Sequence, residues 1–204
     1  MKFLKWLDNF WYHNKWKTII SLFLAVVLFI CIFQLATKKN YDACIMYVGA
    51  KTGAIPQSIE TDIVALIGDE KKTVSFARTT YDPDNNLAAE ANMMAQEQLA
   101  NMLASPYYIY IMDKEVYEIY KDSPVFTKLE AIYGDAIPDY AYDDSALIYS
   151  KTEFAINSES DDAIPDDAVI VLKVKPYMWG KSVAKREERN FQYHKELFKK
   201  IVGE

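Results

Sequence analysis

The chain is poor in the residues on which most catalytic and metal sites depend. Only two cysteines, Cys31 and Cys44, and two histidines, His13 and His194, occur among its 204 residues. Their spacing matches no zinc site, which needs several Cys or His ligands close together. Cys31 lies in a long apolar run and Cys44 in a predicted strand, so no internal disulfide is expected. The sequence predicts neither a metal site nor a cofactor.

Glycine is also scarce, and its six residues form no nucleotide-binding or nucleophile motif. Gly49-Ala50-Lys51-Thr52-Gly53 occupies a strand-to-helix junction, but it lacks the G-x-x-x-x-G-K-[ST] order of a phosphate loop. The G-x-G-x-x-G and G-x-S-x-G patterns are absent from the sequence. Cys44 is expected to be a buried, inert thiol and His194 a packed residue on the apolar side of a helix. We therefore predict a protein that is not an enzyme.

One long hydrophobic run, residues 18–36, contains no charged side chain. About 20 helical residues cross a bilayer core, so this run predicts a single transmembrane helix anchored in the lipid. No small-residue cleavage site follows it, which favours an uncleaved signal anchor. Slightly more lysines precede the run than follow it. This excess predicts a cytoplasmic N-terminus and an extracellular C-terminal domain.

The segments on either side of the run differ in character. Residues 1–17 place Phe3, Trp6, Leu7, Phe10 and Trp11 on one helical face, which predicts an amphipathic segment in the membrane interface or a partner-binding cytoplasmic helix. Residues 37–204 are predicted to be one extracytoplasmic domain. Residues 41–204 hold 17 of the 23 basic and 28 of the 29 acidic residues, a net charge of −11. This acidity argues against binding to nucleic acid or an anionic membrane surface.

The hydrophobic pattern of the domain predicts an α/β fold with a mainly parallel sheet. Strands at 41–48, 72–80 and 107–112 alternate with helices at 58–67, 87–103 and 114–120, and Asp113 is expected to cap the last of these helices. The second half predicts a helix at 125–133, a hairpin joining 146–149 to 153–156, a strand at 168–175 and a helix at 185–202. The lack of disulfides outside the span favours the surface of a Gram-positive-like bacterium.

One passage carries a family resemblance. The order strand, helix, strand, long helix, strand ends in Ser105-Pro106-Tyr107-Tyr108-Ile109-Tyr110-Ile111-Met112-Asp113. Over about residues 41–121 this order resembles the first lobe of extracellular solute-binding proteins of the type 2 periplasmic class. The resemblance implies a membrane-anchored, non-catalytic binding protein for a small solute. The family closes two lobes around its ligand, whereas this chain has room for one.

Ligands of open α/β sheets bind beyond the carboxyl ends of the strands. This rule nominates eight ligand-binding residues, which would otherwise be ordinary loop residues: Gly49, Lys51, Thr52, Thr79, Thr80, Tyr81, Tyr107 and Asp113. Two other functions stay open. The chain would be an accessory or docking subunit of a membrane protein complex if its span and interfacial segment do the work. It would be a hydrolase if carboxylates such as Asp113 and Asp143 shared a cleft.

Overall fold

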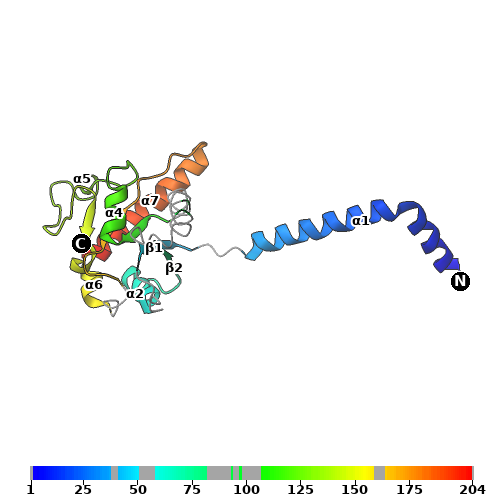
Figure 1. Cartoon of the computed structure of the whole chain (residues 1–204), viewed down its shortest axis with the longest axis horizontal. Coiled ribbons are helices and arrows are strands. Elements are labelled where there is room, and N and C mark those ends of the chain that lie inside the picture. The colour runs from blue at the N-terminus through cyan, green and yellow to red at the C-terminus, as the bar shows by residue number, and fades with distance from the viewer. Residues whose placement is uncertain are drawn as a thin grey trace. The chain divides into compact units, whose positions relative to one another are not determined.

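The computed structural model describes residues 2–37, 41–50, 58–81, 93, 97, 107–158 and 164–203. These residues belong to two compact units, residues 1–40 and 41–204 (Figure 1). The predicted helix at 87–103 lies outside the described residues except for Met93 and Glu97, both of which are helical. The nominated residues Lys51 and Thr52 also lie outside them.

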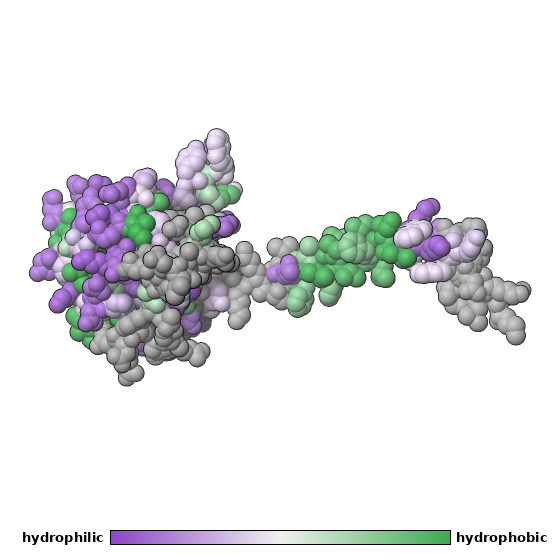
Figure 2. Space-filling view, in the orientation of Figure 1, coloured by the Kyte–Doolittle hydropathy of each residue, from purple (hydrophilic) through white to green (hydrophobic). Residues whose placement is uncertain are grey.

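The N-terminal unit is a single helix, α1 (Lys2–Thr37). Its segment Asn14–Gln34 is long and apolar enough to cross a membrane, judged by length and composition. At 1.5 Å per residue these 21 residues extend over about 32 Å, close to the thickness of a bilayer core. Figure 2 shows this stretch as an almost uninterrupted hydrophobic surface. Residues 2–17, predicted to be an amphipathic segment, belong to the same helix as the span.

The second unit is built on a five-stranded mixed sheet with the order β2-β1-β3-β5-β4. The strands are β1 (Ala43–Gly49), β2 (Val74–Thr80), β3 (Ile109–Met112), β4 (Ala146–Ile148) and β5 (Val169–Leu172). β1 is parallel to β2 and β3, and β5 is antiparallel to β3 and β4. Four strands therefore run in one direction and β5 opposes them. We call the end of the sheet at which these four strands finish the carboxyl end, and the opposite one the amino end.

Helices cover both faces of the sheet, and every residue of β1 is buried. The helices are α2 (Ser58–Ile67), α4 (Lys114–Tyr120), α5 (Leu129–Tyr133), α6 (Glu153–Asn157) and α7 (Lys181–Val202). Because side chains alternate along a strand, Ile45 and Tyr47 pack in one cluster with residues of α2 and α7, whereas Met46 and Val48 pack in another with residues of α4. Burial on both faces explains the continuous apolar run of this strand.

The strand β2 lies at one margin of the sheet and is partly covered by its neighbour α2. The side chain of Glu60 on α2 accepts a hydrogen bond from the backbone N–H of Phe76, with 3.0 Å between Oε1 and N. At the other margin, β4 has only three residues, and Leu147 forms an isolated bridge with Ala141. At one margin a backbone donor of β2 is thus already bound by Glu60, and at the other margin β4 is short.

Two predictions for the second half are wrong. Residues 153–156 do not pair with 146–149 in a hairpin but belong to α6, because the Thr152 side chain accepts a hydrogen bond from Ala155 N–H and begins a helix. The expected helix at 125–133 starts only at Leu129, since Phe126 bridges to Lys173 beside β5. Short apolar runs fit a strand and a buried helix equally well, which accounts for the first error.

His194 joins α7 to the first strand of the sheet. It is buried, as the sequence predicted, and its Nε2 accepts a hydrogen bond from the backbone N–H of Cys44 at 3.3 Å. Its Nδ1 lies 2.7 Å from the carbonyl oxygen of Asn190, so Nδ1 carries the proton and donates. Burial lowers the pKa of His194 below its usual value, against the smaller opposing effect of the Asn190 carbonyl.

The lowered pKa of His194 makes folding sensitive to mild acid. Above the unfolded-state pKa of about 6.5 both states are neutral, and below it only the unfolded chain binds the proton. We expect stability to fall as the pH drops below this value, by at most about 1.4 kcal/mol per pH unit. Chemical unfolding of the full chain in detergent, followed by circular dichroism from pH 8 to 5, measures this slope.

The His194→Gln variant is the control, because a glutamine oxygen can accept from Cys44 N–H without titrating. In the variant, the free energy of unfolding should no longer fall with pH from near neutral. It should still fall at lower pH, where carboxylates titrate. Identical slopes for the two proteins would show that His194 is not held neutral by the fold.

Candidate functional site

Asp113 organises the carboxyl end of the sheet. It follows β3 directly, and its backbone N–H donates to Val48 O at 3.0 Å. Its Oδ1 accepts a hydrogen bond from the hydroxyl of Tyr47 at 2.7 Å, and its Oδ2 accepts one from the N–H of Ala50 at 2.8 Å. Asp113 occupies the predicted N-cap position of α4, but its carboxylate makes no cap hydrogen bond and turns toward β1 instead. One side chain therefore joins the ends of two neighbouring strands.

Gly49 permits this close approach. A Cβ atom at this position would lie 2.4 Å from the carboxyl carbon of Asp113, well inside van der Waals contact. The carbonyl oxygen of Gly49 also accepts a hydrogen bond from Tyr81 N–H at 3.0 Å, which extends the pairing of β1 with β2 by one residue. Only glycine, which has no side chain, therefore fits at position 49.

Tyr47 presents a protonated hydroxyl to Asp113. Its side chain is fully buried. Burial, followed by the hydrogen bond to Asp113, raises the pKa of Tyr47 far above its ordinary value. The charge of Asp167, which precedes β5 at the same end of the sheet, acts in the same direction. The hydroxyl is therefore a fixed donor at physiological pH and cannot serve as a base.

Arg78 is the least satisfied polar side chain among the described residues at this end. It is paired with Tyr47 in the register of β1 and β2, and its Cζ lies 5.6 Å from the centre of the Tyr47 ring. Its Nε and Nη2 are buried and have no hydrogen-bond partner in the described part of the chain. These two nitrogens lie on the same side of the guanidinium group and form the fork that pairs with a carboxylate.

Arg78 is not among the residues predicted from the sequence, although the sequence contains a signal for it. Val74, Phe76 and Arg78 alternate along β2 and share the face that packs against the main core cluster. A charged residue on the apolar side of a strand is unusual, because buried charges are rarely left unpaired. That break in the alternation of β2 is the signal that singles out Arg78.

The structure gathers five of the eight nominated residues at the carboxyl end: Gly49, Thr79, Thr80, Tyr81 and Asp113. Tyr81 is buried and packs in the core cluster with Met46, so its side chain supports the fold. Tyr107 does not join this group, because it lies two residues before β3 and therefore at the amino end. Lys51 and Thr52 fall outside the described residues.

The carboxylates of the hydrolase hypothesis are both occupied by structural hydrogen bonds. Asp143 accepts from the Tyr117 hydroxyl at 2.7 Å and from the backbone N–H groups of Ser145 and Ala146. Asp113 accepts from Tyr47 and Ala50, as described above. Each side chain thus holds a different turn in place. Among the described residues, no group of three or more His, Cys, Asp or Glu side chains could hold a metal ion.

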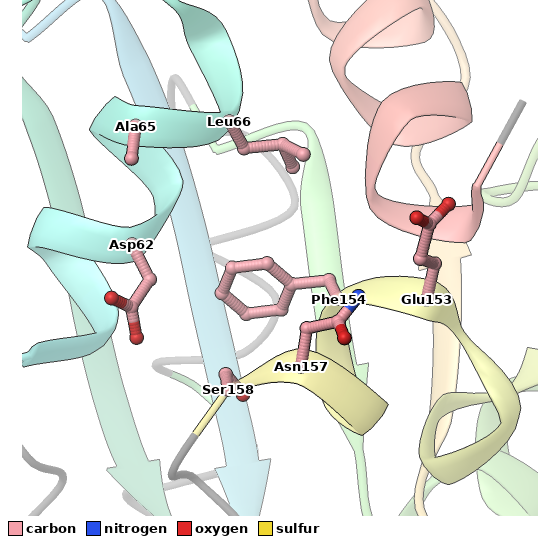
Figure 3. Close-up of a pocket in the computed structure, with 7 residues that line it drawn as sticks. All are labelled: Asp62, Ala65, Leu66, Glu153, Phe154, Asn157 and Ser158. Carbon is pink, nitrogen blue, oxygen red and sulfur yellow. The ribbon is translucent and has the colours of Figure 1, made fainter.

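A pocket of about 260 Å³ lies between α2 and α6, away from the nominated residues. Figure 3 shows the Phe154 ring of α6 reaching between the two helices, with Leu66 and Asp62 on the α2 side. The other lining residues are Ala65, Glu153, Asn157 and Ser158. The pocket is open to solvent and mostly apolar, and it holds no unsatisfied buried donor among the described atoms. We therefore place the candidate site at Arg78.

Adding a side chain at Gly49 should break the junction made by Asp113. We expect Gly49→Ala to lower the free energy of unfolding by about 1–3 kcal/mol, as overpacking usually does. Removing the clashing partner should relieve part of this cost, so Gly49→Ala and Asp113→Ala should be non-additive in a double-mutant cycle. Urea unfolding of the four proteins measures the coupling. Strict additivity would contradict the contact.

Comparisons with protein families, with characterised proteins and with solved structures give no significant match for this chain. No relative therefore supplies a site or an activity to carry over.

Proposed function

We propose that this chain is a membrane-anchored, extracytoplasmic binding protein without catalytic activity, and that its ligand is a small solute bearing a carboxylate. The observation that carries the proposal is the guanidinium fork of Arg78, whose Nε and Nη2 are buried with no hydrogen-bond partner among the described residues. The sequence resemblance of residues 41–121 to a solute-binding lobe points to the same class of function.

The fork favours a carboxylate on energetic grounds. Leaving a buried donor unsatisfied costs about 1–3 kcal/mol, and more when the group is charged. The two oxygen atoms of a carboxylate match Nε and Nη2 of one guanidinium in a bidentate pair. Because both nitrogens are covered in the ligand-free protein, binding requires the atoms around Arg78 to move aside. The ligand would then remove a cost that the free protein bears.

The surrounding acids favour a ligand that also carries a positive charge. Asp113 and Asp167 lie at the same end of the sheet as Arg78, and residues 41–204 carry a net charge of −11. A simple anion would be repelled by this field, whereas a zwitterion places its ammonium group toward the carboxylates. The Tyr47 hydroxyl donates a hydrogen bond to Asp113, and both oxygens of Asp113 already accept hydrogen bonds, so neither group acts as a base, which fits binding better than chemistry.

The helix α1 supplies the anchor in this proposal. Its apolar run, residues 18–36, inserts in the bilayer, and the excess of lysines that precede this run keeps the N-terminus in the cytoplasm. The α/β unit then lies on the outer side of the cell membrane, as in a Gram-positive-like bacterium. A solute captured there would be presented at the membrane surface.

The proposal predicts that Arg78 lowers the stability of the free protein. We expect Arg78→Leu to raise the free energy of unfolding by about 1 kcal/mol, because it removes two buried donors, Nε and Nη2, that have no partner among the described residues. The same variant should lose all ligand-induced stabilisation. Thermal unfolding of the full chain in detergent, against amino acids, dipeptides, uronic acids, neutral sugars and phosphate, measures both effects.

A ligand at about 100 times its dissociation constant stabilises the folded state by roughly 2.7 kcal/mol, or on the order of 5–10 °C for a domain of this size. Arg78→Lys is the matched control, since it keeps the charge but lacks the fork, and it should bind weakly. If no compound in the panel shifts the wild type, the solute-binding proposal fails and the docking-subunit alternative is favoured. If Arg78→Leu is less stable than the wild type, the two unsatisfied donors of Arg78 do not carry the cost that we infer.

A further inference from the structure

A second feature of the domain is the exposed aromatic turn that follows β5. The side chains of Tyr177 and Trp179 are 81% and 84% exposed, and their rings meet edge to face with centroids 5.9 Å apart. Met178 between them is also exposed. Large apolar side chains grouped at one exposed point usually mark a surface that meets a partner or a membrane.

The helix after this turn is largely solvent-exposed through its first half. Residues 181–190 of α7 are exposed or half-exposed. Glu187 accepts a hydrogen bond from the hydroxyl of buried Tyr108 at 2.6 Å, and the apolar packing of the helix begins at Phe191. Figure 1 shows this part of α7, in orange, rising above the rest of the domain, and Figure 2 shows the same part as a projection. The turn and the first half of α7 therefore form one protruding segment, residues 174–189, which we call the basic aromatic segment.

The basic aromatic segment leaves the sheet at its amino end. Leu172, the last residue of β5, pairs with Ile109, and Ile109 pairs with Ile45 of β1. The chain therefore emerges from β5 beside the first residues of β1. Tyr41, where the described part of the domain begins and the chain arrives from α1, precedes β1 by two residues. The segment and the attachment of the anchor thus share one end of the domain.

The charge of this segment is opposite to that of the domain. It contains five basic residues, namely Lys175, Lys181, Lys185, Arg186 and Arg189, and two acidic residues, Glu187 and Glu188, for a net charge of +3. Residues 41–204 as a whole carry −11. The net charge of the domain predicted that it avoids an anionic surface. That sum does not reveal the local basic region at residues 174–189.

We propose that the basic aromatic segment docks on the surface of the bilayer that holds α1, with Tyr177 and Trp179 in the interface and its lysines and arginines against anionic headgroups. Trp and Tyr are enriched at membrane interfaces because their rings are apolar with one polar group. Basic residues beside such rings add attraction to anionic lipid. This inference goes beyond the proposed solute binding and does not depend on Arg78.

A lipid surface fits the segment better than a protein partner for two reasons. The chain itself brings the amino end of the domain to the bilayer, so docking is intramolecular and needs little affinity. The segment also combines the two components of interfacial anchors, aromatic rings and excess positive charge, at the one end of the domain that leads to the membrane span. The effect would be to hold the carboxyl end of the sheet away from the lipid and open to solutes.

Trp179 makes the proposal directly testable, because it is the only tryptophan in residues 41–204. Trp6, Trp11 and Trp16 are replaced by Phe in the full chain, which leaves the domain unchanged. The protein is reconstituted in vesicles of phosphatidylcholine and phosphatidylglycerol. We expect the Trp179 emission to shift to the blue relative to detergent and to be quenched by lipids carrying bromine on their acyl chains. Iodide in the buffer should quench it poorly.

The matched control moves the reporter to Ile156, which is 69% exposed on α6 beside the far end of α7. Ile156→Trp, in the same chain with Trp179→Phe, should show iodide quenching and no lipid quenching. Reversing two charges, Lys181→Glu and Lys185→Glu, should reduce the docked-to-undocked ratio more than about tenfold. Equal lipid quenching of the two reporters, or quenching of Trp179 that the charge reversal leaves unchanged, would overturn the proposal.

Discussion

The carboxylate of Asp113 is the contact on which the carboxyl end of this domain depends. It holds the Tyr47 hydroxyl and the Ala50 amide at once, and it does so only because Gly49 has no side chain. Charge-assisted hydrogen bonds of this kind are stronger than neutral ones and fix geometry as well as energy. The end of β1 is therefore set by β3, and the Tyr47 ring is held beside Arg78 as a consequence.

Arg78 and Asp113 show two opposite ways of placing a charge in a fold. The charge of Asp113 is compensated locally, by donors from the neighbouring strand. The Nε and Nη2 of Arg78 are buried without a described partner, an arrangement that persists only when the rest of the structure enforces it. If Arg78 binds a carboxylate, as proposed, binding gains from this difference, because the free state is destabilised and the bound state is not.

The sequence predicted the parts of the fold that follow from local periodicity. The apolar run of α1, the strands β1, β2, β3 and β5 and the helices α2, α4 and α7 all appear near their expected positions. It could not predict the reversed direction of β5, because strand pairing is decided by contacts far apart in the sequence. For the same reason it nominated Asp113 correctly as a residue of the carboxyl end but assigned its side chain to a helix cap, and it placed Tyr107 at the wrong end of its strand.

The hydrogen bond from Phe76 to Glu60 has a consequence for how copies of this protein coexist. With α1 in a membrane, as proposed, the chain is confined to two dimensions, where identical domains meet far more often than in solution. An open strand margin would let one sheet continue into the next, which is the usual route to edge-to-edge association. Glu60 occupies a backbone donor midway along β2 and places a carboxylate there, so neighbouring copies present like charge to one another instead of a template.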